Sequence, residues 1–320
     1  MDLRENDLGL GELDISDEEL LSRAAWYYYH DALTQADIGE RLGLPRIKVS
    51  RMLERARRMG LIQVQINSTL GSCLGLERDL GGAFGLRGAV VIPSLGDAAL
   101  LNDRLGQAAA QYLMRTLGTG EMLAVGWGDT VTRSLQRLAY TFASRNVSVI
   151  SLTGGVTGYL QGLGMPQFAT HHVHLIPAPI LASSPELARA LKAETRIAEL
   201  LTMNQLAQAA LVGIGAIDEA ATLVKSGYIS AADLTLFRRM GAVGDVLGQF
   251  YGASGQLLPL PLHEQIIGVS LADLHAIPLR IGAAGGAHKI PAMLGALAGK
   301  HVNALITDED TALALLRGSP

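Results

Sequence analysis

The segment from residue 33 to residue 67 constrains this chain most, because its caps, turn and apolar stripe have the spacing of two short helices. Thr34 is placed to cap a first helix, Gly43 to end it, and Pro45 to begin a second, where its missing N–H costs nothing. The second helix, to about residue 59, would bury one stripe made of Val49, Leu53 and Ala56. The pattern predicts a helix-turn-helix.

The second of these helices is strongly basic in a chain whose formal net charge is -4, and Glu54 is its only acidic residue. Such a helix suits the major groove of duplex DNA, which phosphates line. The first turns of a recognition helix approach base edges, so the expected base contacts are Arg46, Lys48, Ser50 and Arg51. The expected phosphate contacts are Thr34, Gln35, Arg55, Arg57 and Arg58, and Pro45 completes the predicted DNA-binding surface. A small helical bundle with a solvated basic face is the alternative interpretation.

The flanking residues extend this predicted domain on both sides. Ile62, Val64 and Ile66 alternate with polar residues, which is the period of a half-buried strand and indicates the wing of a winged helix-turn-helix. A helix is expected from residue 17 to residue 30. Its aromatic run at residues 26–29 could stack on a base or fill the small core, and the core is the favoured interpretation because a three-helix domain needs large side chains to bury enough area. The preceding residues 1–16 are acidic with interspersed glycines, so we expect them to be disordered.

A length of 320 residues is too great for this module alone and predicts a second, larger domain. Hydrophobic residues make up 49% of the chain, yet no apolar run is long enough to span a bilayer, and the acidic N-terminus lacks the build of a signal peptide. The single cysteine, Cys73, can form neither an internal disulfide nor a cysteine-based metal site, which agrees with a reducing compartment. We therefore expect a cytoplasmic protein without a membrane partner, a metal or a cofactor.

From Gly88 onward, apolar β-branched strands alternate with amphipathic helices, which is typical of a parallel sheet covered on both faces. The expected strands are 89–93, 122–126, 147–152, 173–177, 209–214, 279–283 and 302–307. The expected helices are 102–117, 129–144, 184–201, 231–240, 290–298 and 308–317. A further helix at 70–84 is expected to link this region to the DNA-binding domain.

Glycine-bounded loops follow three of the predicted strands, at the edge where an open α/β sheet binds its ligand. Such loops let backbone N–H groups and helix N-termini approach an anion, and the third loop has a lysine four residues past its first glycine. The residues concerned are Gly126, Trp127, Gly128, Asp129 and Thr130; Thr153, Gly154 and Gly155; and Gly285, Gly286 and Lys289. Together they favour a phosphorylated small-molecule ligand, although each loop alone is typical of an ordinary strand-to-helix turn.

A series of longer motifs covers nearly the whole chain after the acidic N-terminus: "YYYHDALTQADIGERLGLPRIKVSRMLE", "GWGDT", "LTGGV", "IPAPILASS", "VGIGAI", "SGYIS", "GAVGDVLGQFY", "AGGAHK" and "NALITDEDTA". In these motifs the chain resembles the SorC family of sugar-responsive transcriptional regulators. The resemblance implies an effector domain similar in fold to sugar-phosphate isomerases and glucosamine-6-phosphate deaminases, and tetramers that bind paired operator sites. It also implies that the glycine loops and Lys289 surround the phosphate or the sugar body. Asp245 would accept hydrogen bonds from effector hydroxyls, and Trp127 would close the pocket.

These observations predict an α/β protein with a winged helix-turn-helix at 17–68, a linker helix at 69–87 and an effector-binding domain with a parallel sheet at 88–320. The expected function is a transcriptional repressor whose affinity for operator DNA is controlled by a phosphorylated sugar, polyol or autoinducer-2-like effector. The alternative is a sugar-phosphate isomerase or deaminase with an appended DNA-binding domain, which needs a carboxylate or histidine base beside the sugar. No Asp-x-His-type arrangement accompanies the glycine loops, which favours a regulator that is not an enzyme.

Overall fold

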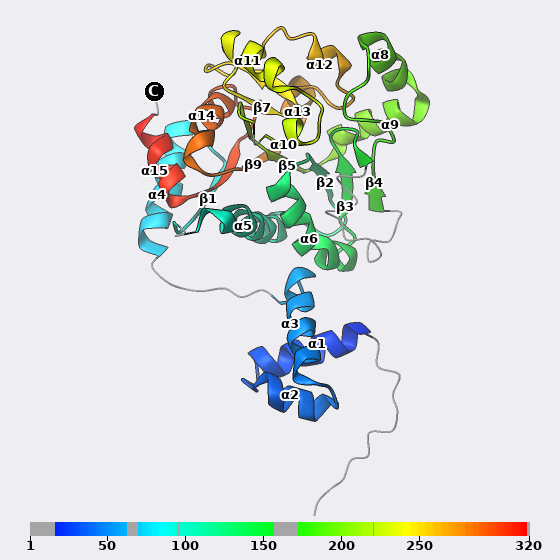
Figure 1. Cartoon of the computed structure of the whole chain (residues 1–320), viewed down its shortest axis with the longest axis vertical. Coiled ribbons are helices and arrows are strands. Elements are labelled where there is room, and N and C mark those ends of the chain that lie inside the picture. Colours follow the sequence, from blue (N-terminus) through cyan, green and yellow to red (C-terminus); the bar gives the residue numbers. More distant parts are fainter. Residues whose placement is uncertain (1–16, 63–69, 95–96, 157–171, 220, 319–320) are drawn as a thin grey trace, which may run out of the picture. The chain divides into compact units, whose positions relative to one another are not determined.

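The computed structural model describes residues 17–62, 70–94, 97–156, 172–219 and 221–318. The chain divides into two compact units at residue 64. The small unit contains three helices, and the large unit contains a parallel sheet with helices on both faces (Figure 1). No helix within these ranges is long and apolar enough to cross a bilayer.

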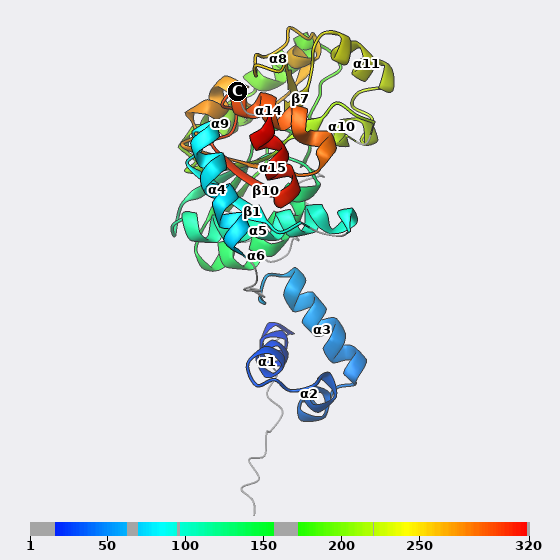
Figure 2. The ribbon, with the colours of Figure 1, turned by 90° about the vertical axis from the view of Figure 1, so that its left-hand side faces the viewer.

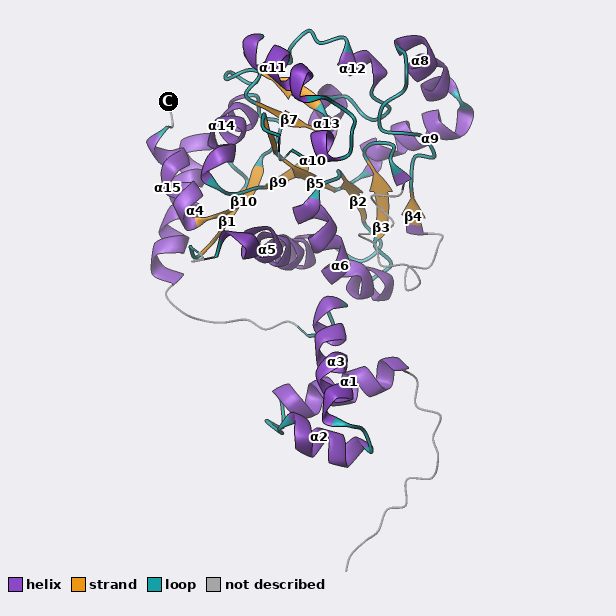
Figure 3. Ribbon diagram, viewed as in Figure 1, coloured by secondary structure: helices purple, strands orange, loops and turns teal. Residues whose placement is uncertain are grey.

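The small unit confirms the predicted helix-turn-helix. Its helices are α1 (Asp17–Tyr29), α2 (Gln35–Leu42) and α3 (Arg46–Arg58). They enclose a core made of Leu21, Ala24, Ile38, Val49, Met52, Leu53 and Ala56. Within residues 17–62 the structure has helices and no strand (Figure 3). The predicted wing falls mostly on residues 63–69, which lie outside the described residues, as does the predicted disordered segment 1–16.

The prediction that the whole aromatic run fills the small core is wrong for two of its four residues. Tyr27 and Tyr28 pack against the core, whereas Trp26 is 57% exposed and Tyr29 is 39% exposed. Successive residues of a helix point about 100° apart, so four consecutive side chains cannot share one buried face. Trp26 instead stacks on His30, with the ring centroids 4.1 Å apart.

The large unit is organised around a seven-stranded sheet whose strands are all parallel. In spatial order the strands are β1 (Gly88–Ile92), β10 (Ala304–Asp308), β9 (Leu279–Ala283), β5 (Ala209–Gly213), β2 (Met122–Val125), β3 (Ser148–Ser151) and β4 (Val173–His174). The register aligns residues 88–92 of β1 with residues 304–308 of β10, and residues 209–213 of β5 with residues 279–283 of β9. This sheet confirms the predicted fold class.

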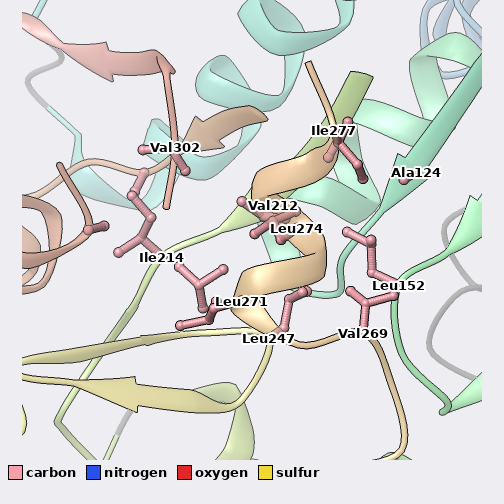
Figure 4. Close-up of a cluster of buried hydrophobic side chains, with 14 of the residues drawn as sticks. Ala124, Leu152, Val212, Ile214, Leu247, Val269, Leu271, Leu274, Ile277 and Val302 are labelled. Carbon is pink, nitrogen blue, oxygen red and sulfur yellow. The ribbon is translucent and has the colours of Figure 1, made fainter. Parts of the chain in front are cut away.

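Two layers of helices cover the sheet, because most strand residues are apolar and both faces must be buried. One face is covered by α5 (Leu101–Thr116), which the short turn η1 (Ala98–Leu100) precedes, and α6 (Asp129–Ser144). The other face is covered by α4 (Leu70–Phe84), α8 (Pro185–Ala193), α9 (Thr195–Met203), η3 (Asn204–Leu206), α13 (Leu271–Ala276), α14 (Ile290–Ala298) and α15 (Glu309–Arg317). Figure 4 shows the centre of this second layer, where Leu271, Leu274 and Ile277 lie beside Val212 and Leu152.

A second, antiparallel sheet was not expected from the sequence. It consists of β6 (Gly215–Ala216), β7 (Gly244–Val246) and β8 (Gln249–Tyr251). Together with α10 (Thr222–Lys225), α11 (Ala231–Arg239) and α12 (Leu262–Gln265) it builds a third apolar core that includes Phe237 and Phe250. Strands of two or three residues are too short to show a period of alternation, so only their pairing reveals them.

The helix predicted at 184–201 is two helices, α8 and α9, separated by an extended backbone at Glu194 (φ -58°, ψ 129°). Ala188 and Ile197 are both buried in the same core. They are nine residues apart, so an uninterrupted helix would place them about 180° apart, on opposite faces. The break at Glu194 lets both residues face the sheet.

Candidate DNA-binding surface and effector site

Reciprocal hydrogen bonds between Thr34 and Asp37 close the N-terminus of α2. The Asp37 N–H donates to Thr34 Oγ1 at 3.3 Å, while Thr34 donates from its N–H and Oγ1 to Asp37 Oδ2 at 3.1 and 2.6 Å. The hydrogen bonds from Thr34 lower the pKa of Asp37. This capping box fixes where α2 begins and engages the Thr34 hydroxyl within the protein.

The turn between α2 and α3 is tight enough to require glycine at position 39. A Cβ on Gly39 would lie 2.5 Å from the Leu44 carbonyl oxygen, and the Leu44 N–H donates to the Gly39 carbonyl at 2.7 Å. Gly43 ends α2 in the left-handed conformation, and Pro45 is the N-cap of α3. The turn holds α3 so that Val49, Met52, Leu53 and Ala56 are buried.

The cationic side chains of α3 face solvent. All the predicted base contacts, Arg46, Lys48, Ser50 and Arg51, are exposed, as are Arg55, Arg57 and Arg58; Pro45 and Thr34 are exposed as well, and Gln35 is half-buried. Arg57 Nε donates to the Tyr29 hydroxyl at 2.6 Å, and its guanidinium lies 5.7 Å from the Tyr29 ring centroid. Helix α1 therefore orients one of the arginines that we expect to contact phosphate.

The large unit has a topological switch point between β2 and β5. From β2 the chain proceeds outward through β3 and β4, and from β5 it proceeds the opposite way through β9 and β10. Ligands of open α/β sheets bind outside the carboxyl ends of the strands at such a point. The loops after these two strands meet there: a Cβ on Gly213 would lie 3.4 Å from the Trp127 carbonyl oxygen. Trp127 also packs against all three apolar cores of the large unit.

Asp245 lies in the middle strand of the small sheet and is 6% exposed. It pairs with Gly215 of β6, where a Cβ would lie 1.9 Å from Asp245 Oδ1, so only glycine leaves room for the carboxylate. The Gly248 N–H donates to Asp245 Oδ2 at 3.0 Å. Burial raises the pKa of Asp245 to about 6, against the opposing effects of that N–H and of Lys289.

Lys289 comes from a later loop of the chain and lies near enough to Asp245 for their charges to act on each other. It ends the short turn η4 (Ala287–Lys289) after β9 and is the N-cap of α14. Burial lowers the pKa of Lys289, and the charges of Asp245, Asp218 and Asp129 act to raise it. Among the described residues, no carboxylate lies within 4 Å of Lys289 to form an ion pair. The Lys289 ammonium is therefore partly desolvated, and the carboxylates of Asp129, Asp218 and Asp245, which come from three separate segments, act on its charge.

Hydrogen bonds to neighbouring helices hold the loops around Lys289. Asp129, the first residue of α6, accepts from Asn102 Nδ2 at 2.9 Å and from Arg133 Nε at 3.0 Å. In the loop after β9, the Gly286 N–H donates to Thr311 Oγ1 at 2.8 Å, and Thr311 Oγ1 donates to Asp308 Oδ2 at 2.6 Å. These contacts preorganise the first and third glycine loops.

The second glycine loop also has engaged N–H groups, as Gly126 has in the first loop, where it donates to the Leu211 carbonyl, and Gly286 in the third. The Gly154 N–H donates to the Ile267 carbonyl and the Gly155 N–H to the Ala178 carbonyl, each at 2.8 Å. Thr153 is buried and donates from Oγ1 to the Gly154 carbonyl at 3.1 Å. The fold brings this loop to the same sheet edge, where it supplies a buried wall. Each of the three loops therefore has at least one glycine N–H that is already used within the protein.

The chain was compared with known proteins. The Sugar-bind family model, a sugar-binding domain, matches residues 68–317. The transcriptional regulator LsrR of Klebsiella pneumoniae is 46% identical over 307 residues, covering 95% of this chain and 94% of the relative. LsrR of Escherichia coli K12 is 44% identical over 315 residues, covering 98% and 99%. Among solved structures, the full-length sorbitol operon regulator SorC of Klebsiella pneumoniae superposes with a TM-score of 0.69 at 29% identity, covering 94% of this chain and 99% of that one.

The chain belongs to the SorC family of sugar-binding transcriptional regulators. A sugar-binding domain of a transcriptional repressor from Vibrio fischeri is also similar, with a TM-score of 0.67 at 26% identity over 77% of this chain and 99% of that one. As a SorC-family protein similar to LsrR, the chain is a DNA-binding regulator controlled by a sugar-like effector.

Two residues of the candidate effector site in this SorC-family chain escaped sequence reasoning. Asp218 lies beyond β6 and acts on Lys289, and Asn102 of α5 holds Asp129 and accepts from Thr130 Oγ1 at 3.3 Å. Asp218 directly follows the motif "VGIGAI". Its place as an acidic residue after a glycine-bounded strand could have indicated a role in the effector site. Asn102 had no such signal. Within the described ranges, no three His, Cys, Asp or Glu side chains are arranged to hold a metal ion.

Proposed function

We propose that this protein is a tetrameric repressor that releases operator DNA when a phosphorylated sugar, polyol or autoinducer-2-like effector binds at the sheet edge beside Lys289. The observation that carries the proposal is the position of Lys289. It is a cation that burial partly desolvates, without an ion-pair partner among the described residues, in the loop after β9, the strand next to β5. A phosphate on the ligand would give Lys289 the direct, charge-assisted partner that the three carboxylates around it do not supply. The similar repressor domain from Vibrio fischeri supports repression as the direction of control.

The proposed site divides recognition between its two charged residues. Lys289 binds the phosphate, together with the loops of residues 126–130 and 285–286 and the N-terminus of α6. There the helix dipole and backbone N–H groups other than those of Gly126 and Gly286, which donate within the protein, favour an anion. Asp245, an acceptor when ionised, binds effector hydroxyls. Trp127 and the loop of residues 153–155 enclose the body of the ligand.

Control of DNA binding follows from linkage between the two sites. If the effector binds the arrangement with weak DNA affinity more tightly, it must lower the affinity for operator DNA. Bound DNA must then lower the affinity for the effector by the same factor, typically about 5–150-fold. The proposal requires no chemical change in the effector, so the protein acts as a regulator and not as an enzyme.

The test is fluorescence anisotropy of the full chain on labelled duplexes from the region upstream of its own gene, at one fixed salt concentration. Phosphorylated and unphosphorylated sugars and polyols are titrated in pairs. Release by a phosphorylated compound, and not by its unphosphorylated partner, is the expected result. DNA binding that no compound changes would overturn the effector assignment. An effector that raises the affinity for DNA would overturn the proposal that the effector releases the repressor from its operator.

Two controls accompany this titration. The same compounds are incubated with the protein and analysed for conversion, because turnover at an appreciable rate would favour the isomerase or deaminase alternative. Sedimentation of the free protein and of the protein–DNA complex measures the oligomeric state, and a species other than a tetramer would contradict that part of the proposal.

A further inference from the structure

The recognition helix α3 carries one large apolar side chain that packing does not explain. Ile47 is 70% exposed, the highest fraction among the exposed large hydrophobic residues of the described chain. It lies in the first turn of α3, between Arg46 and Lys48, and does not belong to the core of the small unit. A β-branched side chain also lowers helix propensity slightly, so Ile47 contributes nothing evident to the stability of α3.

The helical positions around Ile47 place it on the centre line of the exposed face. At about 100° per residue, Ile47 lies opposite the middle of the buried stripe, near Ala56. Ser50, Arg51, Glu54 and Arg58 follow it on the same face within about 60° on either side. Figure 2 shows α3 along its length, with α1 and α2 beside it.

Cations flank this centre line in two rows. Arg46 and Arg57 lie about 80–100° to one side of Ile47, and Lys48 and Arg55 lie about 80–100° to the other. All four are exposed. A helix in the major groove has a phosphate strand on each side and base edges in front of its centre line. The geometry therefore assigns the two rows to the two backbones and the centre line to the bases. In this arrangement Arg46 and Lys48, which the sequence pattern placed among the base contacts, face phosphates instead.

We propose that Ile47 is a specificity-determining residue that reads the C5 methyl group of a thymine in each operator half-site. The major groove presents hydrogen-bond donors and acceptors, and the thymine methyl is its apolar feature. An exposed isoleucine on the centre line would bury its apolar surface against that group. The proposal rests on DNA binding by α3 and does not depend on the identity of the effector.

The test replaces thymine with deoxyuridine, which removes the methyl group and leaves the base pairing unchanged. A duplex is first selected from a random pool by the full-length protein, and each thymine of one half-site is then replaced in turn. For the wild-type protein, one replacement is expected to lower affinity about fourfold, the factor for burying one methyl group. For Ile47→Ala, that same replacement should change nothing, and the affinity for the thymine duplex should already be about fourfold lower.

The matched control is Lys48→Ala, an exposed neighbour in the same turn. It should weaken binding to the thymine and deoxyuridine duplexes by the same factor, because a phosphate contact is indifferent to the methyl group. Ile47→Ala should leave the thermal unfolding midpoint unchanged or slightly raised, since alanine favours helix and the side chain is exposed.

Either of two results would overturn the proposal. One is that no replacement weakens wild-type binding; the other is that the effective replacement weakens Ile47→Ala as much as the wild type. A wild-type protein that enriches no sequence from the pool would instead contradict specific DNA binding itself, which separates failure of the regulator assignment from failure of the role given to Ile47.

Discussion

Gly215 and Asp245 face each other across the β6–β7 pair, and a single added carbon at position 215 would lie 1.9 Å from Asp245 Oδ1. The Asp245 carboxylate thus occupies the space that a side chain at position 215 would fill. Gly215 belongs to β6, and Asp245 is the residue that we assign to the effector hydroxyls. A substitution at Gly215 can therefore displace the Asp245 carboxylate without replacing Asp245 itself.

Gly215→Ala should weaken effector binding at least tenfold and leave DNA affinity unchanged in the absence of effector. The new methyl group must displace the Asp245 carboxylate, since the contact is far shorter than any real Cβ contact. Isothermal titration with the released effector measures the first quantity and anisotropy the second. Gly82→Ala, in open space on the exposed side of α4, is the matched control and should bind effector normally. Equal effector affinities for the two variants would contradict the role of the pair.

Asp245→Asn should stabilise the protein at neutral pH. Burial raises the pKa of Asp245 from 3.8 to about 6, so the folded state holds this proton more tightly than the unfolded state, and stability falls as pH rises from about 4 to about 6. The asparagine amide does not ionise. Relative to the wild type, the free energy of unfolding of the variant should therefore be higher by up to about 3 kcal/mol above pH 6 and unchanged below pH 4. Thermal unfolding at pH 7.5 and 4 measures the difference, while effector binding should weaken because the ionised acceptor is gone.

The control for this prediction is Asp233, whose pKa is shifted in the opposite direction from that of Asp245. Hydrogen bonds from Ser230 lower the pKa of Asp233, so its ionised form stabilises the folded state above the unfolded pKa and this stability is lost as pH falls. Asp233→Asn should therefore destabilise the protein at pH 7.5, and the difference should fade towards acidic pH. A pH-independent difference for Asp245→Asn would contradict the buried carboxylate.

Lys289→Ala should weaken binding of a phosphorylated effector by about 10–100-fold, the range for losing a charge-assisted hydrogen bond. Binding of the unphosphorylated partner compound should change little. Calorimetric titration of both compounds gives the comparison, and Lys225→Ala, an exposed lysine of α10, controls for a general change of charge. Similar losses for the phosphorylated and unphosphorylated compounds would show that Lys289 does not meet the phosphate.

Thr34→Ala should lower both the stability of the small unit and its affinity for DNA. The substitution removes the side-chain acceptor of the capping box and frees the first turn of α2. We expect the thermal midpoint of the small unit to fall by a few degrees and DNA affinity to fall severalfold. Ser230→Ala removes an equivalent capping box from α11 in the large unit. Its DNA affinity should equal that of the wild type, and a loss as large as that of Thr34→Ala would mean that the effect is not local to α2.

Much of the helix-turn-helix was predictable because its signals are local. Thr34, Gly43 and Pro45 act within one or two turns of their own positions, and Val49, Leu53 and Ala56 repeat at the helical period. The alternation of strands and helices after Gly88 was readable for the same reason. Register, strand order and the position of the switch point had no local signal, since they depend on which strands pair.

The candidate site was predictable only in part. The glycine loops and Lys289 were found by their place after strands, and Asp245 entered through the resemblance to the SorC family. The charge of Asp218 near Lys289 and the hydrogen bond between Asn102 and Asp129 join segments that are distant in the sequence. The engaged N–H groups of Gly154 and Gly155 depend likewise on Ile267 and Ala178, which no pattern around residue 154 indicates.

By itself the sequence determined the elements whose periodicity and caps depend on neighbouring residues. These include the basic helix and the alternation of strands and helices that defines the fold class. The tertiary structure alone decided the small antiparallel sheet, the break at Glu194 and the exposure of Trp26 and Ile47. It also decided that the charges of Asp245 and Lys289 act on each other. The physical reason is the range of the forces involved: caps and helical periods act over one turn, whereas burial, pairing and the pKa of a buried carboxylate depend on residues that only folding brings together.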